Sequence, residues 1–109
     1  MLSGEITTDL IDGLIKIFKD ELVSIILYGS VARGDNKEDS DIDIAVVLQN
    51  KISKENKEAF FGLSSQMDIK YDKVFSIIDI ESQKLEQWGE ILPFYKNINN
   101  EGVVLWKAA

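Results

Sequence analysis

Apolar residues recur at helical spacing in two stretches of the chain. The first stretch predicts a helix that begins after a cap at Thr7 or Thr8 and buries one apolar stripe. The stripe consists of Leu10, Ile11, Leu14, Ile15 and Phe18. The second stretch predicts a helix capped by Ser53, in which Gly62 is a weak point. Its inward side consists of Ala59, Phe60, Leu63 and Met67.

Shorter apolar runs, rich in β-branched residues, alternate with these helices and predict strands. Three strands cover residues 23–28, 41–48 and 73–80, and a brief last strand covers 103–106. Residues 81–88 predict a third helix. The order helix, strand, strand, helix, strand, helix is typical of an α/β (α+β) domain in two layers. We therefore expect a small mixed sheet with helices packed on one face.

The length of the chain suits one domain. Its 109 residues lie near the commonest domain size, and no repeat, linker or low-complexity stretch divides them. We expect a single domain over residues 1–109, with the 92–95 segment docked on its body. No apolar run approaches the ~20 residues of a membrane span, and the amino terminus lacks a leader pattern. The expected protein is therefore cytoplasmic and has no membrane partner.

The net charge and the missing residue types narrow the chemistry. A protein that holds a nucleic-acid template usually presents a basic face, but this chain has a net charge of −7 and scattered lysines. We therefore expect no template. The acidic balance either suits a small nucleotide delivered as a metal complex or only gives solubility. Since Cys and His are absent, any metal is bound by oxygen, which favours Mg²⁺ or Mn²⁺.

A glycine-serine turn and a pair of acids join the first two predicted strands. Gly29 and Ser30 follow the first strand, and Asp41 and Asp43 begin the second. Carboxylates at i and i+2 of a strand point to one face, about 6.6 Å apart at ~3.3 Å per residue. A Gly-Ser turn offers backbone N–H groups and a hydroxyl to phosphate. A plain turn and two solvated loop acids are the alternatives, but the combination favours nucleotide chemistry.

Two further polar residues lie between the halves of this motif. Arg33 either donates to a phosphate as a bidentate partner or forms a surface ion pair with Asp35 or Glu38 that contributes little. Ser40 either joins the nucleotide site or positions the loop that leads to Asp41. We include both Arg33 and Ser40 among the candidate nucleotide-binding residues.

Five of the aromatic residues have two possible roles. They are Trp88, Trp106, Tyr28, Phe94 and Tyr95. They could stack on an adenine, although aromatic residues at this density usually belong to the core. Phe94 and Tyr95 fit better with an exposed patch that binds a partner.

The motif resembles the signature of the DNA polymerase beta-like nucleotidyltransferases, in which Gly-Ser is followed after ten residues by Asp-x-Asp. Here the ten residues are 31–40, so the spacing fits without a gap. The fuller form, Gly-Ser-x-Ala-x-Gly at 29–34 and Ser-Asp-Ile-Asp at 40–43, is similar to the minimal nucleotidyltransferases. Those proteins are often the antitoxin partners of helical HEPN-domain toxins. The resemblance extends from the first helix to 102–106 and implies the two-layer nucleotidyltransferase fold.

The resemblance also implies a third acid on a later strand, because two metal ions that bridge phosphate oxygens need several anionic ligands. Asp72 and Asp79 compete for this place, and their opposite strand parity lets only one of them face a shared metal. We choose Asp72, expecting it to begin a third strand parallel to the second. An antiparallel strand would bring Asp79 instead.

The expected catalytic and metal-binding set is therefore Asp41, Asp43 and Asp72. In this set Asp72 would serve as general base or as ligand of the second metal. The alternative for Asp72 is a residue that only turns the chain from helix to strand.

The resemblance implies a transferase that uses ATP and two Mg²⁺ ions, with Mn²⁺ as a substitute, to move AMP or another nucleoside monophosphate onto a hydroxyl. Larger relatives add a helical domain that binds the acceptor, and this sequence ends before one. We therefore expect the acceptor to be a tyrosine of a HEPN-type toxin, which the transfer neutralises. Two alternatives are an antitoxin that acts by binding alone and a small-molecule nucleotidyltransferase, like the antibiotic-modifying relatives, that works as a homodimer.

Overall fold

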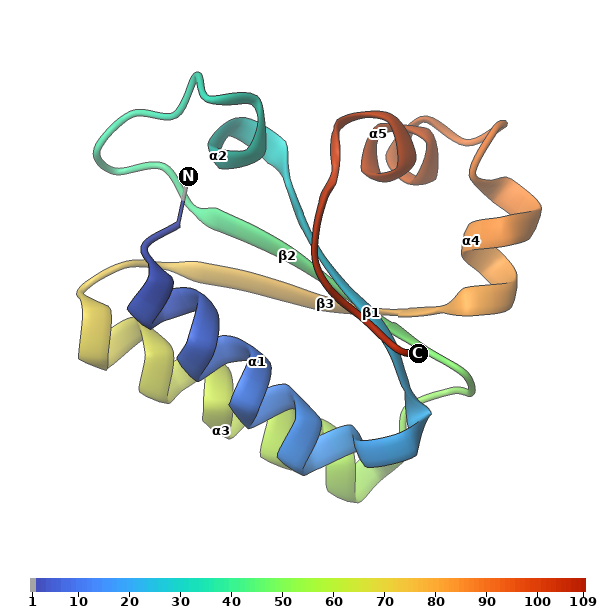
Figure 1. The fold of residues 1–109 in the computed structure, drawn as a ribbon, viewed down its shortest axis with the longest axis horizontal. Helices are drawn as coiled ribbons and strands as arrows, with labels where there is room; N and C mark the ends of the chain where they lie inside the picture. Colours follow the sequence, from blue (N-terminus) through green and yellow to red (C-terminus); the bar gives the residue numbers. More distant parts are fainter. Residues whose placement is uncertain (1) are drawn as a thin grey trace.

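The computed structural model describes residues 2–109, which form one sheet with helices on both of its faces (Figure 1). The strands are β1 (Leu22–Tyr28), β2 (Ile42–Leu48), β3 (Phe75–Glu81) and β4 (Val103–Lys107). The helices are α1 (Gly4–Phe18), α2 (Gly29–Arg33), α3 (Lys54–Tyr71), α4 (Ser82–Trp88) and α5 (Pro93–Glu101), with a short 3-10 helix η1 (Lys19–Glu21) before β1.

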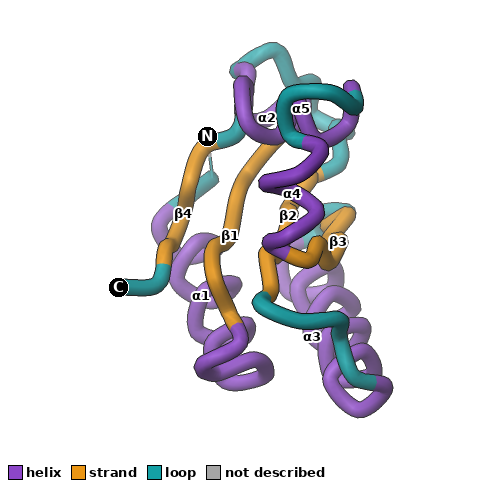
Figure 2. Tube along the Cα trace, turned by 90° about the vertical axis from the view of Figure 1, so that its right-hand side faces the viewer, coloured by secondary structure: helices purple, strands orange, loops and turns teal. Residues whose placement is uncertain are grey.

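The sheet is mixed, as the sequence predicts. Its strand order is β3-β2-β1-β4, and Figure 2 shows the strands following one another from β4 at one edge to β3 at the other. β1 pairs antiparallel with both β2 and β4, whereas β2 and β3 are parallel. Parallel neighbours need a long crossover connection, and α3 supplies it. The expected parallel pairing of the second and third strands is confirmed.

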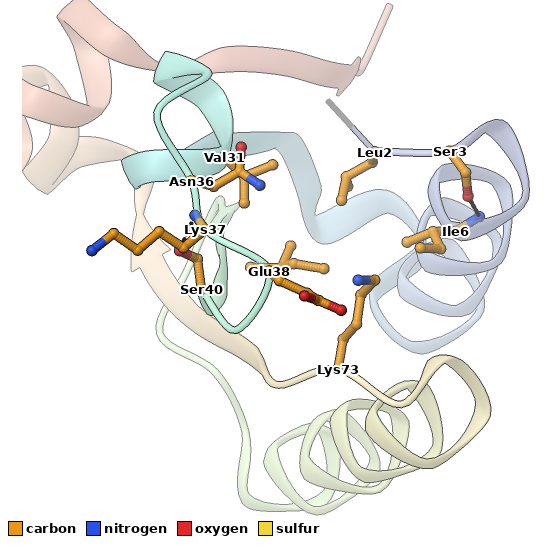
Figure 3. A pocket seen from close by; sticks show the side chains of 10 residues that line it. Leu2, Ser3, Ile6, Val31, Asn36, Lys37, Glu38, Ser40 and Lys73 are labelled. Carbon is orange, nitrogen blue, oxygen red and sulfur yellow. Dashed lines mark hydrogen bonds between the residues drawn. The ribbon is translucent and has the colours of Figure 1, made fainter.

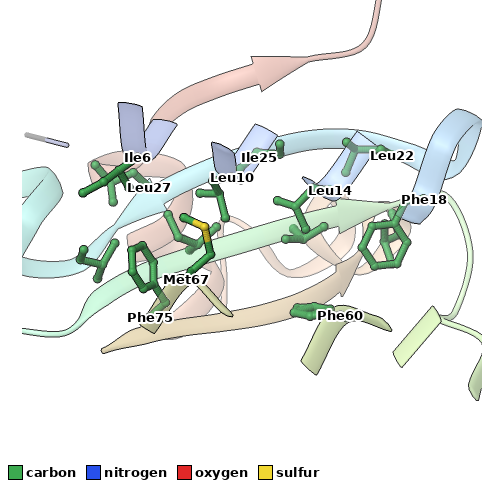
Figure 4. Packing of buried hydrophobic residues seen from close by; sticks show 14 of the residues in the cluster. Ile6, Leu10, Leu14, Phe18, Leu22, Ile25, Leu27, Phe60, Met67 and Phe75 are labelled. Carbon is green, nitrogen blue, oxygen red and sulfur yellow. The ribbon is translucent and has the colours of Figure 1, made fainter. Parts of the chain in front are cut away.

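The larger core lies between the sheet and the layer formed by α1 and α3. Alternate residues of β2 from Ile42 to Leu48 face this layer, and Leu10 and Leu14 of α1 are fully buried against them. Figure 4 shows these side chains gathered between the helices and the sheet. The predicted stripes of α1 and α3 therefore provide the helical layer that the sequence led us to expect, except that Ile15 and Ala59 are exposed and do not belong to the core.

A smaller core covers the opposite face of the sheet. Ala45 and Val47 of β2 point to this face, where they pack with Ile26 and Ile80 and with Ile98 of α5. The sequence predicts helices on one face only, so this second layer is an addition. α5 was not predicted as a helix because its sequence begins with Pro93 and is rich in Asn, which is a poor helix former.

The two long helices differ in how well the sequence marks their starts. Ser53 caps α3 as predicted, its Oγ accepting from the N–H of Asn56 at 3.1 Å. α1 instead begins at Gly4, and the Ser3 hydroxyl accepts from the N–H of Ile6 at 3.2 Å. The prediction of a Thr7 or Thr8 cap is therefore wrong. Both threonines lie within the helix, where an earlier serine already provides the cap.

Within residues 2–109, none of the helices combines the length and the apolar composition that crossing a bilayer requires.

Candidate active site

The antiparallel pairing of β1 and β2 brings the two halves of the sequence motif together. Tyr28, the last residue of β1, is the register partner of Asp43, the second residue of β2. The turn that follows Tyr28 therefore begins beside the Asp43 side chain. In this turn α2 starts at Gly29 and ends at Arg33, and Gly34 follows it with a left-handed backbone.

Gly29 is required here for two separate reasons. Its φ of +75° lies in the left-handed region that L side chains rarely adopt. A Cβ on Gly29 would also clash with the Oδ2 of Asp43 and lie only 3.1 Å from the Asp43 Cγ. The backbone of the turn and the Asp43 carboxylate are therefore in direct contact. Gly34 has a similar φ of +78° but open space around it, so only the first reason applies there.

Asp41 and Asp43 are close enough to influence each other electrostatically. Asp41 is exposed and Asp43 is partly buried. Burial raises the pKa of Asp43 first, the negative charge of Asp41 raises it further, and the positive charge of Arg33 works in the opposite direction. The structure thus brings together two like-charged carboxylates. Such oxygen donors are those that a hard divalent cation takes.

Arg33 is held by two acids. Its Nε donates to Asp35 at 3.1 Å, and its Nη1 donates to Glu101 of α5 at 3.0 Å. The Asp35 pair is one that the sequence suggests. Glu101 lies 68 residues away, and no local pattern points to it. The guanidinium nevertheless lies near enough to Asp43 to oppose the rise in the Asp43 pKa.

Ser40 organises the loop between the two halves of the motif. Its Oγ accepts a hydrogen bond from the N–H of Lys37 at 2.8 Å, and the N–H of Ser40 donates back to the Lys37 carbonyl at 3.0 Å. These two bonds close the loop directly before Asp41. The structure therefore gives Ser40 the positioning role that the sequence suggests, and its contact with a nucleotide stays a prediction.

The structure places Asp72 outside the third strand. β3 begins at Phe75 rather than at residue 73, and Asp72 instead ends α3 with a left-handed backbone, φ 52°. The expectation that Asp72 begins the third strand is therefore wrong. Among residues 2–109, no three acidic side chains lie close enough together to hold a metal ion. The reason is that α3 runs on to Tyr71, so the chain reverses at Asp72 before the strand pairing starts.

Asp79 does not serve as the third acid either, because it lies on the other face of the sheet from Asp43. It is the register partner of Val46, whose side chain belongs to the core on the α1 and α3 face. Asp43 has the parity of Ala45 and Val47, which belong to the opposite face. The β3 residue beside Asp43 is Ser76, which is not acidic, so a pattern of carboxylates in the sequence does not point to it.

An aromatic group borders the acids on the α5 side. The ring of Tyr28 packs edge-on against Phe94 with 6.0 Å between ring centroids, and Phe94 packs on Tyr95 at 5.4 Å. Burial and the charge of Asp43 raise the pKa of Tyr28 to about 12. Phe94 is exposed, as predicted for a contact patch, but Tyr95 is partly buried and packs against the smaller core. Trp106, by contrast, packs against the core on the α1 and α3 face.

One cavity lies beside the motif but does not include Asp41 or Asp43. This cavity of about 310 Å³ is formed by the start of α1, Val31 of α2, the loop and Lys73 (Figure 3). Of the motif residues it includes Ser40 but neither Gly29 nor the two acids. A smaller hollow of about 210 Å³ contains Asp72 together with Ser40 and two acids of the loop. The candidate active site therefore lies outside these two hollows, beside the Gly29 turn.

Residues 12–108 match a family model described as "Polymerase beta, Nucleotidyltransferase". Two similar proteins come from Methanocaldococcus jannaschii, and both are named "putative protein adenylyltransferase". MJ0141 is 37% identical over 62 residues, which are 57% of this chain and 63% of that protein. MJ0604 is 32% identical over 98 residues, which are 90% of this chain and 92% of that protein. This chain therefore matches less than two thirds of MJ0141 but nearly all of MJ0604.

Two solved structures share the fold. A toxin–antitoxin complex with AMP-PNP contains a chain with a TM-score of 0.61 and 22% identity, and the match covers 94% of this chain and 73% of that one. The second is a tri-AMPylated HEPN toxin from Shewanella oneidensis in complex with an MNT antitoxin. Its TM-score is 0.60 at 19% identity, covering 95% of this chain and 71% of that one. The family match over nearly the whole chain, together with the Gly29 turn and its two acids, shows that this chain belongs to the polymerase beta family of nucleotidyltransferases and carries a nucleotidyltransferase domain.

Proposed function

We propose that this chain transfers AMP from ATP to a hydroxyl group of a partner protein. The observation that carries the proposal is the contact between Gly29 and the Asp43 carboxylate, which places the backbone of the turn directly beside the pair of acids. The names of the two archaeal relatives support protein adenylylation as the reaction. The complex with AMP-PNP supports ATP as the donor.

Some of the motif residues would bind the phosphates, and the others would bind the cation. Gly29 lets the backbone N–H groups of the turn approach the terminal phosphates, and Ser30 adds a hydroxyl donor. Asp41 and Asp43 would hold a divalent cation, Mg²⁺ or Mn²⁺, which offsets the charge of the phosphates when it is bound. Burial and the negative charge of Asp41 raise the pKa of Asp43. A cation bound between the two acids would reduce the repulsion between their charges.

The transfer itself exchanges one bond at the α-phosphorus for another. The acceptor hydroxyl oxygen forms a bond to the α-phosphorus, and the bond from that phosphorus to the oxygen bridging the α- and β-phosphates breaks. Pyrophosphate leaves with that oxygen from beside Gly29 and Ser30, and the hydroxyl proton passes to solvent. Because Asp41 is exposed, a side chain of a separate protein can reach the pair of acids.

The acceptor that we propose is a tyrosine of a HEPN-domain toxin, which this chain neutralises as its antitoxin. The complex of a tri-AMPylated HEPN toxin with an MNT antitoxin, which shares this fold, supports that partner. The exposed Phe94 beside the acids is suited to contact such a protein, because exposed aromatic residues recur in protein interfaces.

The proposal predicts that a HEPN-domain protein is encoded next to this chain. The test is to purify that protein and incubate it with this chain, α-labelled ATP and Mg²⁺. We expect label on a tyrosine of that protein, loss of labelling in EDTA, and loss in Asp43→Asn. Asp79→Asn is the matched control, since it removes one charge from the same sheet on the opposite face. Labelling that survives both EDTA and Asp43→Asn would overturn the proposal.

A further inference from the structure

Ser76 of β3 lies beside Asp43 of β2. The parallel pairing of β2 and β3 makes it the register partner of Asp43. Paired residues of neighbouring strands point to the same face, and the next pairs confirm this. Ala45 with Ile78 and Val47 with Ile80 all belong to the core beneath α4 and α5. The Ser76 side chain therefore shares a face with Asp43.

Among the positions of β3, this one is the best placed to complete a second cation site. Neighbouring strands lie about 4.8 Å apart, and the two cations of a two-metal site are about 4 Å apart. A side chain at position 76 thus stands at the distance where it could bind a second cation next to the one held by Asp43. A serine hydroxyl brings no charge, whereas hard divalent cations in such sites rely on carboxylates.

The other acids near β3 do not replace it in the part of the chain that the structure describes. Asp72 lies on the cap of α3, and Asp79 pairs with Val46 on the opposite face of the sheet. No group of three metal-ligating side chains occurs among residues 2–109. Asp41 and Asp43 therefore fit one divalent cation. They do not fit the two cations that the sequence led us to expect.

We infer that the side chains of this chain hold one divalent cation with the nucleotide, and that Ser76 occupies the place of the missing ligand for a second. The inference rests on the proposed function and refines it. Without a carboxylate at position 76, this chain offers no group there to bind the acceptor hydroxyl or to receive its proton. Transfer is then slower than in the same site with an acid at that position.

The test counts Mn²⁺ ions bound per chain at saturating AMP-PNP, by equilibrium dialysis with electron paramagnetic resonance detection. We expect one ion for the wild type and two for Ser76→Asp. Ser76→Asn is the matched control because it adds nearly the same volume without the charge, and we expect it to bind one. Asp72→Asn and Asp79→Asn should also bind one. In the labelling assay Ser76→Asp should transfer at least tenfold faster than Ser76→Asn.

The outcomes separate this inference from the proposed function. Two ions in the wild type, or a loss of one in Asp72→Asn, would overturn the inference and leave the proposed function standing. One ion in a Ser76→Asp variant whose circular dichroism shows the native fold would also overturn it. No Mn²⁺ bound with AMP-PNP by the wild type would overturn both. If Ser76→Asp fails to fold, the counts for the wild type and Asp72→Asn decide.

Discussion

Arg33 of α2 and Glu101 of α5 form an ion pair with 3.0 Å between Nη1 and Oε2, although 68 residues separate them in sequence. The pair ties the turn that contains Gly29 to the helix that carries the exposed Phe94. It also occupies the one arginine of the motif. A nucleotide that recruits Arg33 has to compete with Glu101 for the guanidinium.

Glu101→Gln should therefore strengthen nucleotide binding. An exposed ion pair contributes about 0.2–1 kcal/mol, so its removal should lower the Kd for AMP-PNP with Mg²⁺ by up to about fivefold. Isothermal titration calorimetry measures the change. The matched control is Glu90→Gln, which removes the same charge from an exposed position near the start of α5. In an Arg33→Ala background the benefit of Glu101→Gln should disappear; if it persists, Arg33 is not the group released.

Gly29→Ala should damage the fold more than Gly34→Ala does. Both positions have a left-handed backbone, which costs about 1–2 kcal/mol for an alanine. Only at Gly29 does the added Cβ also meet the Asp43 carboxylate, which adds about 1–3 kcal/mol of overpacking. Urea unfolding should show the larger loss for Gly29→Ala, together with lost nucleotide binding. Equal losses in the free energy of unfolding of the two variants would mean that the Asp43 side chain does not contact the turn.

Ser30→Ala should weaken nucleotide binding without changing stability. A hydrogen bond to a charged group contributes about 1.5–3 kcal/mol, so Kd should rise at least about tenfold if the Ser30 hydroxyl binds phosphate. Ser65→Ala, on the exposed side of α3, is the control and should bind as the wild type does. A Kd for Ser30→Ala within about twofold of the wild type would leave Ser30 as a residue that only shapes the turn.

Asp43→Asn should stabilise the protein in EDTA while it abolishes Mg²⁺-dependent nucleotide binding. Burial and the charge of Asp41 raise the pKa of Asp43 in the folded state. The folded protein therefore holds this proton more tightly than the unfolded chain does, and the stability contributed by Asp43 falls as the pH rises through its raised pKa. At pH 7 the asparagine of Asp43→Asn carries no charge, so this variant avoids the loss of stability. Its Tm should be higher than that of the wild type by on the order of 1 °C.

The pH dependence provides the check on that prediction. The gain in Tm should shrink as the pH falls toward the raised pKa of Asp43, because the wild-type side chain then becomes neutral as well. Asp39→Asn removes one charge from the exposed loop and is the control for net charge. Thermal unfolding in EDTA across pH 4.5 to 7 measures all three proteins. A pH-independent gain, or an equal gain in Asp39→Asn, would contradict a role for the Asp43 environment.

Local rules account for the parts of the site that the sequence predicts. A strand that alternates faces puts Asp41 and Asp43 on one side, and a glycine before a serine marks a turn that backbone groups line. The Ser53 cap of α3 follows from the same kind of rule, since a serine before a helical stretch satisfies the N–H groups at its start. Each of these features depends on residues within a few positions of one another.

The sequence by itself therefore determined α1, α3 and α4, the strands, the Gly29 turn and the acid pair, because backbone geometry and side-chain alternation act over short distances. Only the tertiary structure decided which residues stand beside that pair. Ser76 lies next to Asp43, and Asp72 does not, because α3 extends to Tyr71 and delays the start of β3. Arg33 meets Glu101 because α5 packs on the second face of the sheet. Pairing register and helix packing join segments that are far apart along the chain, and no short sequence pattern records them.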